Sequence, residues 1–139
     1  MRTKIVAGNW KMNNDKNESK ALIKDLKKAL KNEPLENTRV IVAPTFVNLS
    51  SSIKAAKDSK VEVVAQNMHQ AKNGAYTGEI SAQMLKAIGI KTVILGHSER
   101  RTYFNETDAS LAEKVDAVLE NNLETIFCFG ELYEDRKSD

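Results

Sequence analysis

Residues 93–101 read Val-Ile-Leu-Gly-His-Ser-Glu-Arg-Arg, and this stretch decides how the rest of the chain is interpreted. An apolar, β-branched run ends at Gly96, a residue type that lets the backbone approach a ligand closely. His97 follows where a strand gives way to a helix beginning at Ser98, and a helix start offers unpaired backbone N–H groups. A titratable ring at such a junction is a candidate for chemistry. The alternative is a surface loop in which His97 is merely solvated, which is the more frequent situation for an isolated histidine.

The composition predicts one globular domain over residues 1–139, with 41% hydrophobic residues and 21 basic against 19 acidic side chains. No basic stripe is interleaved with aromatic residues, so nucleic acid is not an expected partner. The first apolar run, within residues 5–9, is far too short for a signal peptide or a membrane span. Cys128 is the one cysteine, which excludes an internal disulfide and a cysteine metal cage. We therefore expect a cytoplasmic protein without a membrane partner.

Apolar runs and helical faces alternate along the chain. Consecutive apolar positions predict strands that are covered on both faces, and spacings of three and four predict helices. The expected strands are 5–9, 40–43, 62–66, 92–95 and 125–129, and the expected helical faces lie within 22–30, 49–56, 80–88 and 111–119. Ser81 and either Asn105 or Thr107 are the expected caps of the last two helices. This order predicts a parallel sheet with crossover helices.

Two architectures fit five such units. One is a five-stranded doubly wound sheet, and the other is a (β/α)₈ barrel that has been cut short. In both, the carboxyl ends of the strands meet at one edge, where ligands bind. Polar residues gather at these ends, namely Asn9, Lys11, Gln66, Asn67, His97 and Glu99. Because these side chains are expected to converge, the solvated-loop interpretation of His97 loses most of its advantage over a functional one.

Several stretches resemble the triosephosphate isomerase family, in the same order and at similar intervals. They are residues 7–13 (Ala-Gly-Asn-Trp-Lys-Met-Asn), 66–67 (Gln-Asn), 74–81 (Gly-Ala-Tyr-Thr-Gly-Glu-Ile-Ser) and 94–101, with 128–131 as a fifth in which Phe129 replaces the usual small aliphatic residue. The resemblance covers the whole chain but only about the first half of the family's sequence. It implies five strands of a truncated (β/α)₈ TIM barrel.

The resemblance also implies roles for four residues. Lys11 supplies positive charge to an anionic substrate, and Asn9 helps to fix a substrate oxygen. His97 is the electrophile that polarises the carbonyl, and Glu99 is an active-site carboxylate close to Lys11. The implied reaction interconverts dihydroxyacetone phosphate and glyceraldehyde 3-phosphate through an enediolate, which needs no metal and no organic cofactor.

A long polar segment, residues 67–79, acquires a use through the same resemblance. In the family this loop projects into a second subunit of a homodimer. Thr77 then reaches the neighbouring active site, and Glu79 pairs with the partner's Arg100. The alternative is a flexible lobe with a solvated Glu79.

The family's general-base glutamate, lid and phosphate-binding amides lie beyond the fifth strand. We therefore expect the 139-residue chain alone to be inactive, and to self-associate or to need a complementary half. Two other functions compete with the isomerase half. A flavodoxin-like binding or signalling module needs a phosphate loop or a strand-end aspartate, and residues 9–12 (Asn-Trp-Lys-Met) offer neither. A non-catalytic interaction protein would instead use the 67–79 loop as its contact surface.

Overall fold

Helices and strands alternate through residues 2–137, the part of the chain that the structure, a computed structural model, describes. The elements are β1 (Lys4–Asn9), α1 (Lys16–Leu30), β2 (Thr38–Ala43), the 3₁₀ helix η1 (Phe46–Asn48), α2 (Leu49–Ala56), β3 (Val61–Val63), α3 (Ala82–Ala87), β4 (Thr92–Leu95), α4 (Ser98–Tyr103), α5 (Asp108–Glu120), β5 (Glu124–Phe127) and α6 (Tyr133–Lys137). The predicted succession of parallel (β/α) units is confirmed.

The strands lie in sequential order. β1, β2 and β3 form one parallel sheet, and β4 and β5 form another. The two sheets are joined by a parallel bridge between Ala65 and Val93, where Ala65 N–H donates to Thr92 O (3.1 Å) and Ile94 N–H donates to Ala65 O (2.8 Å). A flavodoxin-type doubly wound sheet would place β1 between β2 and β3. The observed order is that of a barrel wall, and the wall is not closed.

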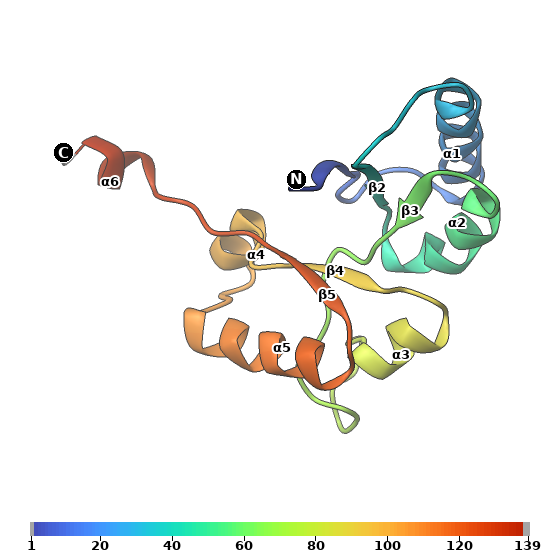
Figure 1. Ribbon diagram of the computed structural model, residues 1–139. Coiled ribbons are helices and arrows are strands. Elements are labelled where there is room, and N and C mark those ends of the chain that lie inside the picture. The colour runs from blue at the N-terminus through green and yellow to red at the C-terminus, as the bar shows by residue number, and fades with distance from the viewer. Residues whose placement is uncertain (1, 138–139) are drawn as a thin grey trace.

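The helices pack beside the strands that they connect. Figure 1 shows α1 and α2 beside β2 and β3, and α3 and α5 beside β4 and β5, whereas α6 lies apart from them at the end of an extended segment. The larger core joins α2, α3, β4 and α5 through buried side chains that include Leu49, Leu85, Val93, Leu111 and Val118. A second core joins α1, α2, β2 and β3 through Ile23, Val42, Ala56 and Val61. This packing fixes the carboxyl ends of the strands at one edge.

Capping residues set where the helices begin. Ser81 caps α3 as predicted, and Thr107, one of the two predicted candidates, caps α5; each side chain accepts a backbone N–H three residues on. α1 begins at Lys16, six residues before its predicted apolar face, because Asp15 and Glu18 form a capping box. The Asp15 side chain accepts the Glu18 N–H (2.9 Å) and the Glu18 carboxylate accepts the Asp15 N–H (2.7 Å).

The third and fifth strands are shorter than predicted. β3 ends at Val63, although Ala65 still bonds to β4, and β5 ends at Phe127, although Cys128 N–H still donates to Leu95 O (2.8 Å).

The outer strands leave apolar side chains in solvent. Val6 in β1 is 62% exposed, and Phe129 beyond β5 is 87% exposed. Each of these strands pairs with one neighbour among the described residues. Self-association of the 139-residue chain, or its need for a complementary half, therefore stays a prediction with a visible cause. No helix of residues 2–137 combines the length and the apolar character that crossing a membrane requires.

Candidate active site

A pocket of about 230 Å³ lies at the carboxyl ends of the strands. It brings together residues that lie at, or shortly after, the carboxyl ends of β1, β3 and β4. The six polar residues predicted to converge all line it, namely Asn9, Lys11, Gln66, Asn67, His97 and Glu99, together with Met12, Arg100 and Phe104. Amides, a lysine, an imidazole and a carboxylate from three separate strand ends thus share one cavity.

A larger groove, of about 520 Å³, lies between α1 and α2. Its polar side chains are Lys16, Lys20, Lys54, Ser50 and Ser51, and we call it the lysine groove. It contains neither an imidazole nor a carboxylate. Because proton transfer needs a group that can give or take a proton near neutral pH, the smaller pocket is the better candidate for acid–base chemistry.

An ion pair connects the end of β1 to α4. The Lys11 ammonium lies 2.6 Å from Glu99 Oε1, and both side chains are about half exposed. The hydrogen bond from Lys11 holds the pKa of the Glu99 carboxyl below its ordinary value, against the opposing effect of desolvation. Glu99 is therefore an ionised carboxylate that keeps the lysine charge at the mouth of the pocket.

His97 is the N-cap residue of α4. Its Nδ1 accepts the backbone N–H of Glu99 at 3.2 Å. We assign the tautomer from this hydrogen bond: Nδ1 carries no proton, so the neutral ring carries its proton on Nε2. The Glu99 Oε2 atom lies 3.6 Å from Nδ1, but the pair is not an ion pair in this tautomer. A neutral imidazole is thus left with one N–H to donate.

Side chains hold both backbone polar groups of Lys11. Asn9 Oδ1 accepts the Lys11 N–H (2.9 Å), and Gln66 Nε2 donates to the Lys11 carbonyl oxygen (2.7 Å). The side-chain nitrogen of Asn9, Nδ2, makes no hydrogen bond within residues 2–137. Asn9 therefore orients the backbone with its oxygen and keeps two N–H donors for another group.

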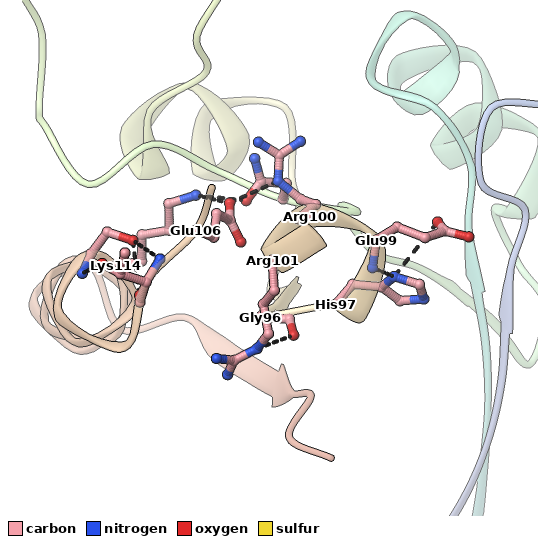
Figure 2. Close-up of polar contacts among 10 residues, drawn as sticks. Gly96, His97, Glu99, Arg100, Arg101, Glu106 and Lys114 are labelled. Atoms are coloured by element: carbon pink, nitrogen blue, oxygen red, sulfur yellow. Dashed lines mark hydrogen bonds and ion pairs between the residues drawn. The ribbon is translucent and has the colours of Figure 1, made fainter. Parts of the chain in front are cut away.

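A buried charge cluster lies on the other side of α4. Figure 2 shows Glu99 and His97 on one side of this helix and Arg100 directed toward Glu106 and Lys114 on the other. The Glu106 carboxylate accepts from Arg100 Nε (2.7 Å) and from Lys114 Nζ, and Lys114 also donates to Asn67 Oδ1 (3.0 Å). The Glu106 and Lys114 side chains are only 5% and 6% exposed. The cluster therefore ties the pocket residue Asn67 to α5.

Glu106 and Lys114 were not predicted to take part in the site. Burial raises the pKa of Glu106, but the hydrogen bonds from Arg100 and Lys114 outweigh burial and keep this pKa below its ordinary value. A signal was present in the sequence, since Lys114 lies on the same helical face as Leu111 and Val118, both buried. A lysine at a core position requires a buried acidic partner.

Gly96 is required by packing against β5. Its φ is +74°, and a Cβ atom there would lie 2.7 Å from the Cys128 carbonyl oxygen. Arg101 closes the same turn, because its Nε donates to Gly96 O (2.9 Å). The close approach to a ligand that the sequence predicted at Gly96 is instead an approach to Cys128, the residue after β5. Figure 2 shows the bond from Arg101 to Gly96 beside His97, the N-cap of α4.

Of the three residues expected at a dimer interface, Arg100 lines the pocket and Thr77 and Glu79 do not. Thr77 and Glu79 are exposed on the 67–79 loop, which is tethered by a hydrogen bond from His69 N–H to Ile80 O (2.8 Å). Glu79 and Arg100 line a second cavity of about 200 Å³. Arg100 forms an ion pair with Glu106, and its guanidinium carbon lies 4.6 Å from the Phe104 ring centroid.

Within the described residues, no three His, Cys, Asp or Glu side chains are placed to hold a metal ion.

Known proteins are similar in sequence to this chain over almost its full length. The sequence model described as triosephosphate isomerase matches residues 4–139. A triosephosphate isomerase of Flavobacterium psychrophilum is 55% identical over 138 residues, covering 99% of this chain and 54% of the relative. A triosephosphate isomerase of Clostridium acetobutylicum is 50% identical over 139 residues, covering 100% of this chain and 55% of the relative. The chain spans about half the length of these curated relatives, and by both measures it belongs to the triosephosphate isomerase family.

Proposed function

We propose that this chain supplies the amino-terminal half of a triosephosphate isomerase active site. The substrate is a phosphorylated triose, and the reaction interconverts dihydroxyacetone phosphate and glyceraldehyde 3-phosphate. The observation that carries the proposal is the convergence of Asn9, Lys11, His97 and Glu99 on one pocket at the carboxyl edge. Active sites of (β/α)₈ barrels lie at this edge. Residues 1–139 are then part of one barrel domain.

The reaction removes a proton next to a carbonyl group and places negative charge on the carbonyl oxygen. The Nε2–H of neutral His97 and the free N–H groups of Asn9 are donors for that oxygen. The Lys11 ammonium attracts the anionic substrate and stabilises the enediolate, while Glu99 holds the ammonium in place. These groups favour the charged intermediate over the neutral carbonyl.

Glu99 is the single carboxylate that lines the pocket in the described part of the chain. Because the Lys11 hydrogen bond keeps its pKa low, Glu99 is a weak base for carbon acids. The proton-abstracting carboxylate must therefore come from elsewhere. We place it, with the lid and the phosphate-binding amides, in the half of the family's chain that has no counterpart here.

The second subunit belongs to the same proposal. The 67–79 loop carries Thr77 and Glu79 outward, and Arg100 lies beside it at the rim of the second cavity. A two-fold contact would place Thr77 near the neighbouring pocket and Glu79 against the partner's Arg100. The assembled enzyme is a cytoplasmic homodimer in this proposal.

Joining this chain to the carboxyl-terminal half of the Flavobacterium psychrophilum relative tests the function. We call this fusion the joined chain. We expect it to interconvert the two triose phosphates in a coupled assay, and we expect the 139-residue chain alone to be at least about 10²-fold slower, because a positioned general base typically contributes 10² to 10⁴ in rate. Circular dichroism and thermal unfolding establish that both proteins fold. A folded joined chain without turnover, or a lone chain as fast as the joined one, would contradict the proposal.

A further inference from the structure

Lys11 has an unusual backbone conformation for the residue that carries the pocket's ammonium group. Its φ is +55°, in the left-handed region that most side-chain-bearing residues avoid. A glycine would adopt this conformation without strain but would bring no charge. Strained residues of this kind persist where surrounding contacts determine them. The contacts that hold Lys11 are therefore of interest for the site.

Gln66 makes the contact that fixes the carbonyl side of Lys11. Its Nε2 donates to Lys11 O (2.7 Å) and to Ala43 O (2.8 Å), so both protons of one amide group are used. Ala43 is the last residue of β2, and its carbonyl also accepts the Trp10 N–H (3.1 Å). Gln66 thereby ties the turn after β1 to the rigid end of β2.

The turn after β1 has little else to hold it against α4. Among the described residues, the Lys11–Glu99 pair is the one hydrogen bond or ion pair that links residues 9–13 to α4. An exposed ion pair with a long side chain does not by itself fix a backbone. The backbone position of Lys11 has to be set on the other side, where Gln66 and Asn9 lie.

We propose that Gln66 is a positioning residue, which holds Lys11 in its left-handed conformation so that the ammonium group meets Glu99 inside the pocket. The importance of Gln66 for catalysis rests on the proposed isomerase function. The effect of Gln66 on the geometry of Lys11 and Glu99 does not, because that geometry can be measured whether or not turnover occurs. Without the amide donor, the Lys11 carbonyl is released and the residue relaxes toward a common conformation. The ammonium group then spends less time against Glu99.

The titration of Glu99 reports this geometry, because Lys11 is the main cause of its low pKa. We would follow side-chain ¹³C signals of glutamate labelled within residues 1–139 of the joined chain, with the Glu99 signal identified by Glu99→Gln. The other charged or titratable groups that line the pocket are His97 and Arg100. Lys11→Met should raise the Glu99 midpoint to that of an ordinary glutamate. Gln66→Met should raise it part of the way, and Gln66→Met added to Lys11→Met should change nothing further.

Gln70→Met is the matched control, since Gln70 is a neighbouring half-buried glutamine that does not line the pocket. It should leave the Glu99 midpoint where it is. If Gln66→Met lowers the unfolding temperature but leaves the Glu99 titration unchanged, Gln66 is merely structural and the proposal is wrong.

A second variant and a second measurement cover the case in which Gln66→Met does not fold. Gln66→Asn retains an amide that is one methylene too short to reach both carbonyl groups, and it should shift the Glu99 titration in the same direction. In the unaltered chain, a hydrogen-bond scalar coupling should connect Gln66 Nε2 with the Lys11 carbonyl carbon. Absence of that coupling in the folded chain would overturn the proposal. Absence of turnover in the joined chain, with the Glu99 shifts as expected, would instead contradict only the proposed function.

Discussion

His97→Asn in the joined chain should lower kcat by about 10²- to 10³-fold, the usual effect of removing one donor to a developing oxyanion. The change is chosen to spare the fold. Asparagine is a good N-cap residue, so its Oδ1 can still accept the Glu99 N–H that His97 Nδ1 accepts now. Its amide is too short to reach the position of Nε2. The loss should therefore fall on the chemical step and leave the helix start intact.

His69→Asn is a closely matched control, because His69 makes the same kind of local contact. Its Nδ1 accepts the Ala71 N–H (3.0 Å), as His97 accepts from the residue two positions on. His69 does not line the pocket. Its replacement should leave kcat within about threefold of the unaltered value, which corresponds to a change in activation free energy of less than about 1 kcal/mol. Equal losses in the two variants would mean that His97 acts only through the fold.

Glu106→Ala should lower the free energy of unfolding of the joined chain by about 3–5 kcal/mol, because it leaves the ammonium group of Lys114 buried without a counter-ion. Arg100 would lose its partner in the same step. Domains of this kind are stable by only about 5–15 kcal/mol, so the variant loses a large share of the total. Urea unfolding followed by circular dichroism measures the change.

A double variant separates the effect of the unpaired Lys114 charge from the effect of removing the Glu106 side chain. Glu106→Ala combined with Lys114→Met should cost less than Glu106→Ala alone, because no buried charge remains unpaired. The pKa of Glu106 is lower in the folded chain than in the unfolded chain. The ionised Glu106 side chain therefore contributes its full share to the free energy of unfolding above the ordinary glutamate pKa of about 4.3, and this share is lost as the pH falls through the lowered pKa of the folded chain. A cost of Glu106→Ala below about 1 kcal/mol, the range of exposed pairs, would show that the cluster is solvated in solution.

The fold was predictable where the pattern is local and repeated. Apolar runs placed the five strands, and the cap at Ser81 was visible as a single residue ahead of an apolar face, whereas the cap of α5 was narrowed to Asn105 or Thr107. The convergence of Asn9, Lys11 and His97 followed from one geometric fact, that the carboxyl ends of parallel strands share an edge. That inference needs no knowledge of side-chain contacts.

What the sequence left open depends on contacts between distant residues. The bond from Gln66 to Lys11 spans 55 positions, and the bond from Lys114 to Asn67 spans 47. Neither spacing has a periodic signature. Leu119 shows the complementary error, because it belongs to the predicted apolar face of α5 and yet is 65% exposed. Periodicity says which residues can share a face, while the neighbours present decide which of them are covered.

Binding of an anionic substrate analogue to the pocket is the most direct test of the proposed function. Phosphoglycolate, a phosphorylated carboxylate shaped like the enediolate, can be titrated into the joined chain with ¹⁵N labels in residues 1–139. We predict that the backbone amide signals of Asn9, Lys11 and His97 shift together and saturate with one dissociation constant. Shifts confined to the lysine groove, at Lys16, Lys20 and Lys54, would contradict it.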